Sequence, residues 1–558
     1  MSSPLSFQGL STGLQTDSLV NAILQQEGQP VQRMQAQQAK NTQRISALQA
    51  IQSNLTALST SLGTLSGTSF TAQTVTSSDS TNAYVTATAS GATVGNYAVN
   101  VSQVATAGRI TSTMSGGAPT NLAVADPLAT PVFSGTSASF AVRGTDGVIK
   151  TLNLASTSNN LYGLRDAINA SGASVQATVV NTGTGANPYQ LVLTATGTGT
   201  GTTNGVVTLA DITSGGAVNS LGITAGTVDS TTAPTTLTGG LQSGTADVAK
   251  DAIFTLNGIQ LTRKTNVVSD AVSGVTFTLK QGGQVGSTSL TVATDTATIT
   301  SAMQDVVSKF NALVSGFNSA AVPSGALYGD SIARSLITQV RTAITGVPSG
   351  LPLTSTYTSA GGVGLKMNQD GTLSLDTTAF QAALAKDPAA VKKVFAFTGA
   401  SDNAAVQFYG AGASTTTGAV AFNISSYVPN GAVSGTFTVN GTNYTLSGNS
   451  GTLVGTAGTP LDGLILTVGG TGSGNLTLSR GVGQAVQDLV TNLTAAVSGQ
   501  LPQIIQSVND QNSRLAEQIT RGQDRLAQRK VVLQAQFAQM EAIVGQLQSA
   551  GASLQNMG

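Results

Sequence analysis

The side chains that most often carry out nucleophilic or acid-base chemistry are missing from this sequence. It contains no histidine, no cysteine and no tryptophan. Histidine is the commonest general base and metal ligand in proteins, and the thiolate of cysteine is a frequent nucleophile. Enzymes of the Ser-His-Asp and Cys-His types are therefore excluded. Any enzyme activity would depend on carboxylates alone, as in the hydrolysis of a polysaccharide.

Two segments resemble reaction motifs but lack the partners that the chemistry requires. "YGDSIARSL" (328–336) contains Gly-Asp-Ser, but Ser331 has no imidazole to take its proton. We expect Asp330 to cap the helix that follows. "GTGTGTTNG" (197–205) is rich in glycine like a phosphate-binding loop, but no Gly-Lys-Ser/Thr follows and no strand-loop-helix pattern surrounds it.

The remaining candidates are carboxylates at predicted turns. They are Asp295, Asp370 and Asp376. Their spacing does not bring two of them together as a metal site or a glycosidase pair would require, so we interpret them as turn formers. The sequence predicts no catalytic residue, no cofactor-binding residue and no metal ligand.

Composition limits the possible partners. Only 9% of the 558 residues are charged, and the formal net charge is zero. Such a chain gives no reason to expect nucleic acid or an anionic membrane surface as a partner. No apolar run is long enough for a membrane span, so we expect no membrane insertion. The first twenty residues have neither a basic region nor an apolar run, so we expect no Sec signal peptide.

The N-terminal part predicts long helices. Apolar residues from Ile45 to Leu65 recur at steps of three and four, close to a heptad repeat, and Gly67 and Phe70 end the pattern. Before it, Thr16 and Asp17 are good N-caps, and the Gln-rich segment 28–44 favours a helix that we expect Pro30 to break or kink.

The C-terminal part mirrors this pattern. Apolar residues continue at about 3.5-residue spacing from Leu501 to Phe537, and we expect one helix from about Gly483 to Leu547. Polar residues or glycine interrupt the seam at Gln511/Asn512, Gly522 and Arg529/Lys530, and we interpret these as gaps that weaken a coiled coil. The stripe of Phe537, Met540, Val544 and Leu547 runs almost to the end of the chain, where most chains turn polar.

The middle of the chain is rich in strand patterns. Asn-Gly, the strongest short hairpin signal, separates extended runs in "AIFTLNGIQLTR" and "GTFTVNGTNYTL". The similarity continues, since 273–292 parallels 462–480, and we interpret this as an internal repeat of a small β module. Further helices are predicted at 296–345 and at Thr377–Phe395, the latter with a break at Pro388.

These elements predict an α+β multi-domain fold. Both termini form a discontinuous helical coiled-coil leg domain, and β-rich head domains are inserted into it. The expected boundaries are 1–40 and 520–558 for terminal leg segments that are flexible until assembled, 41–72, 296–397 and 481–519 for the coiled-coil domain, 73–110 and 245–295 for a head domain, 111–244 for a second inserted head domain, and 398–480 for an extra β module.

Several segments together resemble the flagellar hook-associated protein 2 family, the filament cap. They include "GLSTGLQTDSLVNAILQQEGQPVQRMQAQQ", "GNYAVNVSQVATAGRI", "DAIFTLNGIQLTRKTNVVSDAVSGVTFTLK", "ALYGDSIARSLITQVR", "GGVGLKMNQDGTLSLDTTAFQAALAKDPAAVKKVF" and "RLAEQITRGQDRLAQRKVVLQAQFAQMEAIVGQLQSAGASL". The match spans nearly the whole chain in the family's order. The module at about 400–480 departs from shorter members.

The resemblance implies a structural protein at the tip of the bacterial flagellum. Family members leave the cell through the flagellar type III export channel, with or without an export chaperone. They form a homo-oligomeric ring, usually a pentamer, beside the hook-filament junction proteins, and they retain flagellin and promote its folding and insertion. The apolar terminal helices then become the expected oligomer and filament interface, carried by Leu19, Ile23, Leu515, Ile519, Leu526, Leu533, Phe537, Met540, Val544 and Leu547.

Two other classes stay open from the sequence. A surface adhesin would use exposed Thr- and Gly-rich β modules to bind host or mucin glycans, although adhesins usually carry a Sec signal or an anchor. Another flagellar axial protein, such as a junction protein or flagellin, would also pair its terminal helices. The blocks "NGIQLTRKTNVVSDAVSGVTFTL" and "GDS" favour the cap.

Overall fold

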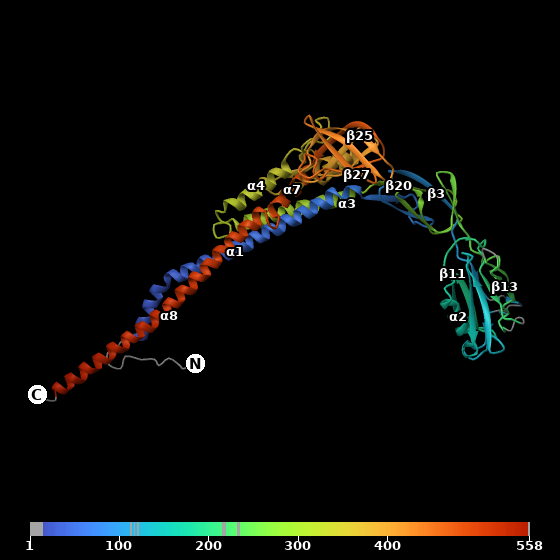
Figure 1. Cartoon of the computed structure of the whole chain (residues 1–558), viewed down its shortest axis with the longest axis horizontal. Coiled ribbons are helices and arrows are strands. Elements are labelled where there is room, and N and C mark those ends of the chain that lie inside the picture. The colour runs from blue at the N-terminus through green and yellow to red at the C-terminus, as the bar shows by residue number, and fades with distance from the viewer. Residues whose placement is uncertain are drawn as a thin grey trace. The chain divides into compact units, whose positions relative to one another are not determined.

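The computed structural model describes residues 15–555, apart from 112–113, 116–117, 120–121, 215–218 and 232–234. The chain divides into two compact units (Figure 1). One, the helical unit, joins the N-terminal part up to Phe70 with Thr296 onward, and the other, the head unit, is Thr71–Asp295. The first 14 residues of the predicted leg segment 1–40, and the last three of 520–558, lie outside the described residues.

The helical unit is built around two long helices from opposite ends of the sequence. Helix α1 is Thr16–Ser66 and helix α8 is Gln500–Gln555, and they lie side by side (Figure 1). The shorter helices of the unit are α3 (Thr296–Ala320), α4 (Ser331–Thr345), α5 (Thr377–Lys386), α6 (Pro388–Phe395) and α7 (Val482–Thr494), with the 3₁₀ turns η1 (Ser69–Thr71) and η3 (Gly361–Val363) and the hairpin β21 (Leu365–Met367) and β22 (Leu373–Leu375).

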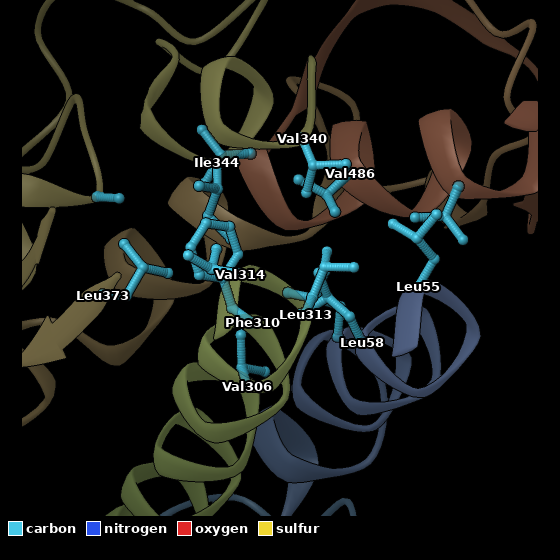
Figure 2. Packing of buried hydrophobic residues seen from close by; sticks show 14 of the residues in the cluster. Leu55, Leu58, Val306, Phe310, Leu313, Val314, Val340, Ile344, Leu373 and Val486 are labelled. Carbon is cyan, nitrogen blue, oxygen red and sulfur yellow. The ribbon is translucent and has the colours of Figure 1, made fainter. Parts of the chain in front are cut away.

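One apolar core holds these helices together. Leu55 and Leu58 of α1 pack with Phe310 of α3 and Val486 of α7, and all of them are almost completely buried (Figure 2). The apolar residues of α1 lie three and four positions apart from Leu48 to Leu65, so they share one face of the helix. The heptad-like pattern in the sequence therefore builds the core of a multi-helix domain here.

Two predicted helix breaks differ from the structure. Helix α1 runs through Pro30 as one continuous helix, so the expected break is absent, while a kink there stays a prediction. Pro30 is exposed, so water can bond the carbonyl that the missing N–H leaves free. The helix expected from 483 to 547 is divided, because α7 ends at Thr494 and α8 begins at Gln500. Pro502 lies in the first turn of α8, where its lack of an N–H costs nothing, and this favours a helix start there.

Aspartates begin three of the shorter helices. As predicted, Asp330 caps α4, and its carboxylate accepts hydrogen bonds from the backbone N–H groups of Ile332 and Ala333. Asp376 caps α5 and Asp387 caps α6. The expected break at Pro388 is confirmed, because α5 ends before it and Pro388 is the first residue of α6. The predicted block 296–345 is two helices, α3 and α4, separated by the segment that carries "YGD".

The head unit contains a β domain made from two separate stretches of sequence, which we call the first β domain. Its strands are β1 (Gln73–Ser77), β2 (Val85–Ala89), β3 (Gly95–Gln103), β16 (Ala252–Leu256), β17 (Ile259–Arg263), β18 (Val267–Val272), β19 (Val275–Leu279) and β20 (Thr288–Thr294). They form a sheet of order β1-β20-β3-β16-β17 and a second sheet of order β18-β19-β2. Phe254 and Phe277 are buried in its core.

A separate domain is inserted between β3 and β16. It contains helix α2 (Leu161–Ala170), the 3₁₀ turn η2 (Ser156–Ser158) and the strands β4 (Arg109–Ile110), β5 (Met114–Ser115), β6 (Ala118–Pro119), β7 (Ala123–Val124), β8 (Ser137–Arg143), β9 (Ile149–Ala155), β10 (Val175–Asn181), β11 (Tyr189–Ala195), β12 (Thr208–Asp211), β13 (Gly226–Asp229), β14 (Thr236–Gly239) and β15 (Leu241–Gln242). Its own apolar core includes Phe140 and Ile168.

Residues 397–480 form a second β domain within the helical unit. Its strands are β23 (Phe397–Ser401), β24 (Val406–Gly410), β25 (Gly418–Tyr427), β26 (Ala432–Val439), β27 (Thr442–Asn449), β28 (Thr452–Val454), β29 (Ile465–Val468) and β30 (Gly472–Arg480). Their order is β23-β30-β25-β26-β27-β28-β29-β24. Replacing each strand by its counterpart in the first β domain gives β1-β20-β3-β16-β17, then β18-β19-β2, so the two domains share one strand order. It forms a single eight-stranded sheet in the second domain and two sheets in the first.

The strand register confirms the predicted repeat. Gly95 of β3 lies opposite Val292 of β20, and Gly418 of β25 lies opposite Leu478 of β30. "GNYAVNVSQ" in β3 and "GAVAFNISS" in β25 share Gly, Ala, Asn and Ser at the same positions. Both Asn-Gly hairpins are also confirmed, because the Asn and the Gly of each turn have positive φ angles.

Candidate assembly interface

The two terminal helices form an antiparallel pair, and close contacts set its register. A methyl group built on Gly522 of α8 would lie 2.6 Å from Cγ2 of Val31 in α1, and one built on Gly28 of α1 would lie 3.6 Å from Cδ1 of Leu526. Both glycines are buried. These glycines therefore let the backbones of α1 and α8 approach closely. Gly522 is a contact between the two helices, whereas the sequence analysis interpreted it as a gap in the apolar seam.

The other two predicted gaps are polar contacts between the same helices. Near the middle of the pair, Nε2 of Gln38 lies 3.5 Å from the carbonyl oxygen of Asn512, and Nδ2 of Asn512 lies 3.4 Å from Oγ1 of Thr42. Asn512 Oδ1 is buried and accepts no hydrogen bond from any described residue. Further out, Arg529 forms an ion pair with Glu27 at 3.3 Å. A polar contact within the seam of a coiled coil lowers stability but fixes the register.

Ten residues were predicted to form the outward interface, and the structure divides them by exposure. Ile519 and Leu533 are buried, at 7% and 6% exposure. In the register set by Val31 and Gly522, Leu533 faces Val20, which is also buried. These two side chains are covered within the chain, and an interface role for them stays a prediction.

The other eight remain at least partly accessible. Leu19 is 41% and Leu547 is 66% exposed. Partly buried side chains make up the rest: Ile23, Leu515, Leu526, Phe537, Met540 and Val544. In the same register Thr16, where α1 begins, faces residue 537. Among the described residues, α8 beyond this point therefore has no partner from α1.

The sequence analysis missed accessible apolar residues next to the seam. Val532 of α8 is 46% exposed and Ile543 is 56% exposed. Met540, Ile543, Val544 and Leu547 follow the i, i+3, i+4, i+7 pattern, so they share one helix face. We call these four residues the terminal stripe. The signal was available in the sequence, but a strict 3.5-residue seam omits Ile543.

We expect a valine at position 522 to open the outer part of this pair. The added isopropyl group would collide with Val31, and overpacking of this kind costs about 1–3 kcal/mol. Amide hydrogen exchange at residues 16–41 should accelerate roughly 5- to 150-fold in Gly522→Val. Gly551→Val is the matched control, because no atom lies within 4 Å of a methyl group at that position of α8. Equal exchange in both variants would contradict the close contact.

Several carboxylates cap helices or form ion pairs. Asp330 also binds Arg44 of α1 at 2.8 Å, and its side chain is 5% exposed. The pKa of Asp376 is lowered, chiefly because its carboxylate accepts a hydrogen bond from the N–H of Ala379. The pKa of Asp270 is lowered by the hydrogen bond from Arg263. Among the described residues, no three acidic side chains gather as a metal site would need, and none of the described helices is long and apolar enough to cross a membrane.

In this fold, helices from both ends of the chain pair, and β domains are inserted between them. A family model for the flagellar hook-associated protein 2 C-terminus matches residues 249–549, and one for the N-terminus matches residues 12–108. The C-terminal model alone spans more than half of the sequence. The chain belongs to the flagellar hook-associated protein 2 family, the cap proteins of the flagellar filament.

Curated relatives carry the same description. The chain is 28% identical over 405 residues to the B-type flagellar hook-associated protein 2 of Pseudomonas aeruginosa PAO1, covering 69% of this chain and 80% of that protein. It is 26% identical to the flagellar hook-associated protein 2 of Escherichia coli K12, covering 69% and 79%.

A solved structure is also similar. The crystal structure of the D1-D2-D3 domains of the flagellar cap protein from Escherichia coli aligns at 26% identity and a TM-score of 0.46, covering 62% of this chain and 89% of that one.

Proposed function

We propose that this chain caps the distal end of the bacterial flagellar filament as a homo-oligomeric ring. The cap retains exported flagellin and promotes its folding and insertion at the growing tip. The ring, its pentameric number, its export and its neighbours among the hook-filament junction proteins come from the family resemblance. The alternatives of an adhesin and of another axial protein are not favoured, because the family models and the curated relatives agree on one family.

The observation that supports this proposal most strongly is the terminal stripe. It lies at the end of α8, past the start of α1, and its Ile543 and Leu547 are more than half exposed. Each Leu-sized side chain that becomes buried contributes roughly 1.5–3 kcal/mol. A few such residues give a grip on neighbouring cap subunits and flagellin that can still be released after each insertion. Leu19, Ile23, Leu515, Leu526 and Phe537 extend the proposed surface along the pair.

Deleting the gene tests the function directly. We expect unpolymerised flagellin in the culture medium and bare hooks in electron micrographs, and we expect the intact gene to restore filaments. Full-length filaments combined with lost surface attachment would contradict the cap and favour an adhesin. Activity of the purified protein against polysaccharides, lost on replacing one aspartate, would reopen the question of catalysis.

A further inference from the structure

A polar pocket lies between α1 and the segment that leads into α4. Its volume is about 370 Å³, near the lower end of the range of roughly 300–1,000 Å³ that ligand pockets occupy. Both elements belong to the helical unit, so the pocket is formed within one compact unit. Side chains of α1 and of the segment "YGDS" line it, among them Lys40, Asn41, Arg44, Tyr328, Asp330 and Ser331.

The acidic side chain of the pocket, Asp330, already uses both of its carboxylate oxygens. Its Oδ1 accepts hydrogen bonds from two backbone N–H groups at the start of α4, and its Oδ2 accepts one from Nε of Arg44 at 2.8 Å. The side chain of Asp330 is 5% exposed. Asp330 therefore holds Arg44 at the wall of the pocket and leaves no carboxylate oxygen for the other donors.

Several hydrogen-bond donors of the pocket have no acceptor. Asn41 is 6% exposed, and its Oδ1 accepts from Nε2 of Gln37, but its Nδ2 donates to no described residue. Lys40 is exposed and forms no ion pair within the described part of the chain. A buried amide donor that stays unpaired costs free energy, so a ligand that brings an acceptor to Asn41 is stabilised there.

The charge of the pocket favours a carboxylate as this ligand. Among the lining residues Lys40 and Arg44 are positive and Asp330 is negative, which leaves one net positive charge. A carboxylate carries one negative charge and only accepts hydrogen bonds, so it matches both the net charge and the unused donors. A phosphate group carries roughly 1.5–2 negative charges at pH 7 and would be repelled more strongly by Asp330.

Tyr328 indicates that the carboxylate belongs to a peptide. Its side chain lines the pocket and is 64% exposed. Tyrosine offers a broad apolar ring together with a hydroxyl group, and it is a frequent anchor of contacts between proteins. A small free anion would leave this ring uncovered, whereas the chain on either side of an acidic residue can pack against it.

We propose that this pocket binds the carboxylate of an acidic side chain from a partner protein. Lys40 and Nδ2 of Asn41 bind the carboxylate oxygens, and Tyr328 packs against the adjoining peptide. The site is separate from the terminal stripe, which is apolar and lies on α8. In the cap it adds a charge-dependent contact to the helical unit, and only this last statement rests on the proposed function.

Binding of a labelled peptide by the full chain tests the ligand. Fluorescence anisotropy is measured with a fluorescein-labelled peptide of alternating glycine and glutamate, and the peptide with glutamine in place of glutamate is the control ligand. We expect Lys40→Glu to weaken binding of the acidic peptide roughly tenfold or more, because a repelling charge replaces an attracting one. Arg33→Glu is the matched control, since it makes the same charge change at an exposed position of α1 outside the pocket.

Asn41→Asp supplies the carboxylate from within the chain. The new group has the size of the amide and can bind Lys40, so we expect this variant to lose peptide binding without a fall in melting temperature at pH 7. Asn311→Asp is the comparison, because Nδ2 of Asn311 donates to the carbonyl oxygen of Leu373 at 2.8 Å. A carboxylate would face this oxygen without a partner, and the melting temperature should fall.

Circular dichroism establishes that each variant is folded. Equal affinity of wild type and Lys40→Glu for the acidic peptide would overturn the proposal, as would a wild-type chain that binds both peptides equally or neither. A fall in melting temperature for Asn41→Asp as large as that for Asn311→Asp would also contradict it. Stronger competition by phosphate than by acetate would disprove the choice of a carboxylate, and acetate that competes as well as the unlabelled peptide would disprove the role of Tyr328. The gene-deletion phenotype judges the cap function separately.

Discussion

Cells that produce Phe537→Asp, Val544→Asp in place of the wild type should lose their filaments and release flagellin into the medium. Phe537 faces the start of α1, and Val544 belongs to the terminal stripe. A carboxylate that is taken out of water without a partner costs several kcal/mol. Burying two such carboxylates on this surface costs more free energy than a few apolar contacts contribute. Filament length by electron microscopy and flagellin in the medium measure the effect.

The matched control for this variant is Gln539→Asp, Gln546→Asp. These glutamines are exposed, lie on the same helix and are also seven residues apart, so the control adds the same charge to the same element. We expect normal filaments from it. The variant itself must be detected outside the cell, so that a failure of export is distinguished from a failure of capping. Normal filaments from Phe537→Asp, Val544→Asp would disprove the role of this surface.

Replacing Phe310 with alanine should have the largest effect on stability. Phe310 is completely buried in the core of the helical unit and packs among Val306, Val314 and Leu313 (Figure 2). Truncation of a buried phenylalanine costs about 3–5 kcal/mol, because transfer free energy and packing are both lost. Denaturant unfolding of the purified chain, followed by far-UV circular dichroism, should show this loss in the transition of the helices.

Two comparisons control the prediction for Phe310→Ala. Gln304→Ala, at an exposed position of α3, should change stability by no more than about 0.5 kcal/mol. The head unit has its own apolar cores, so its strands should keep their stability in Phe310→Ala. A uniform destabilisation of both units would contradict the division into two compact units.

Neighbouring residues in the sequence were sufficient to predict several features of this protein. The missing histidine and cysteine exclude most catalytic designs. The Asn-Gly turns, the Asp330 cap and the break at Pro388 are each determined by a few neighbouring residues, and the structure confirms them. The repeat was also visible, because corresponding strands in the two β domains keep apolar residues at matching core positions and share the Asn-Gly turn.

Other features depended on which segments meet in space. The sequence could not show that Ile519 and Leu533 are used within the chain, because α1 covers them from nearly 500 residues away. It could not show that Gly522 is a contact, since only the position of Val31 makes it one. The apolar spacing in one helix predicts which face of that helix is apolar. The helix that packs on this face determines which of its residues stay accessible to another protein.

The sequence by itself determined the family, the repeat and the presence of apolar helices at both ends. The tertiary structure decided which apolar residues remain accessible. It showed that Ile519 and Leu533 are covered within the chain, and it added the exposed Ile543 to the terminal stripe. The physical reason is that hydrophobic periodicity is a local property, whereas burial depends on every segment that packs nearby.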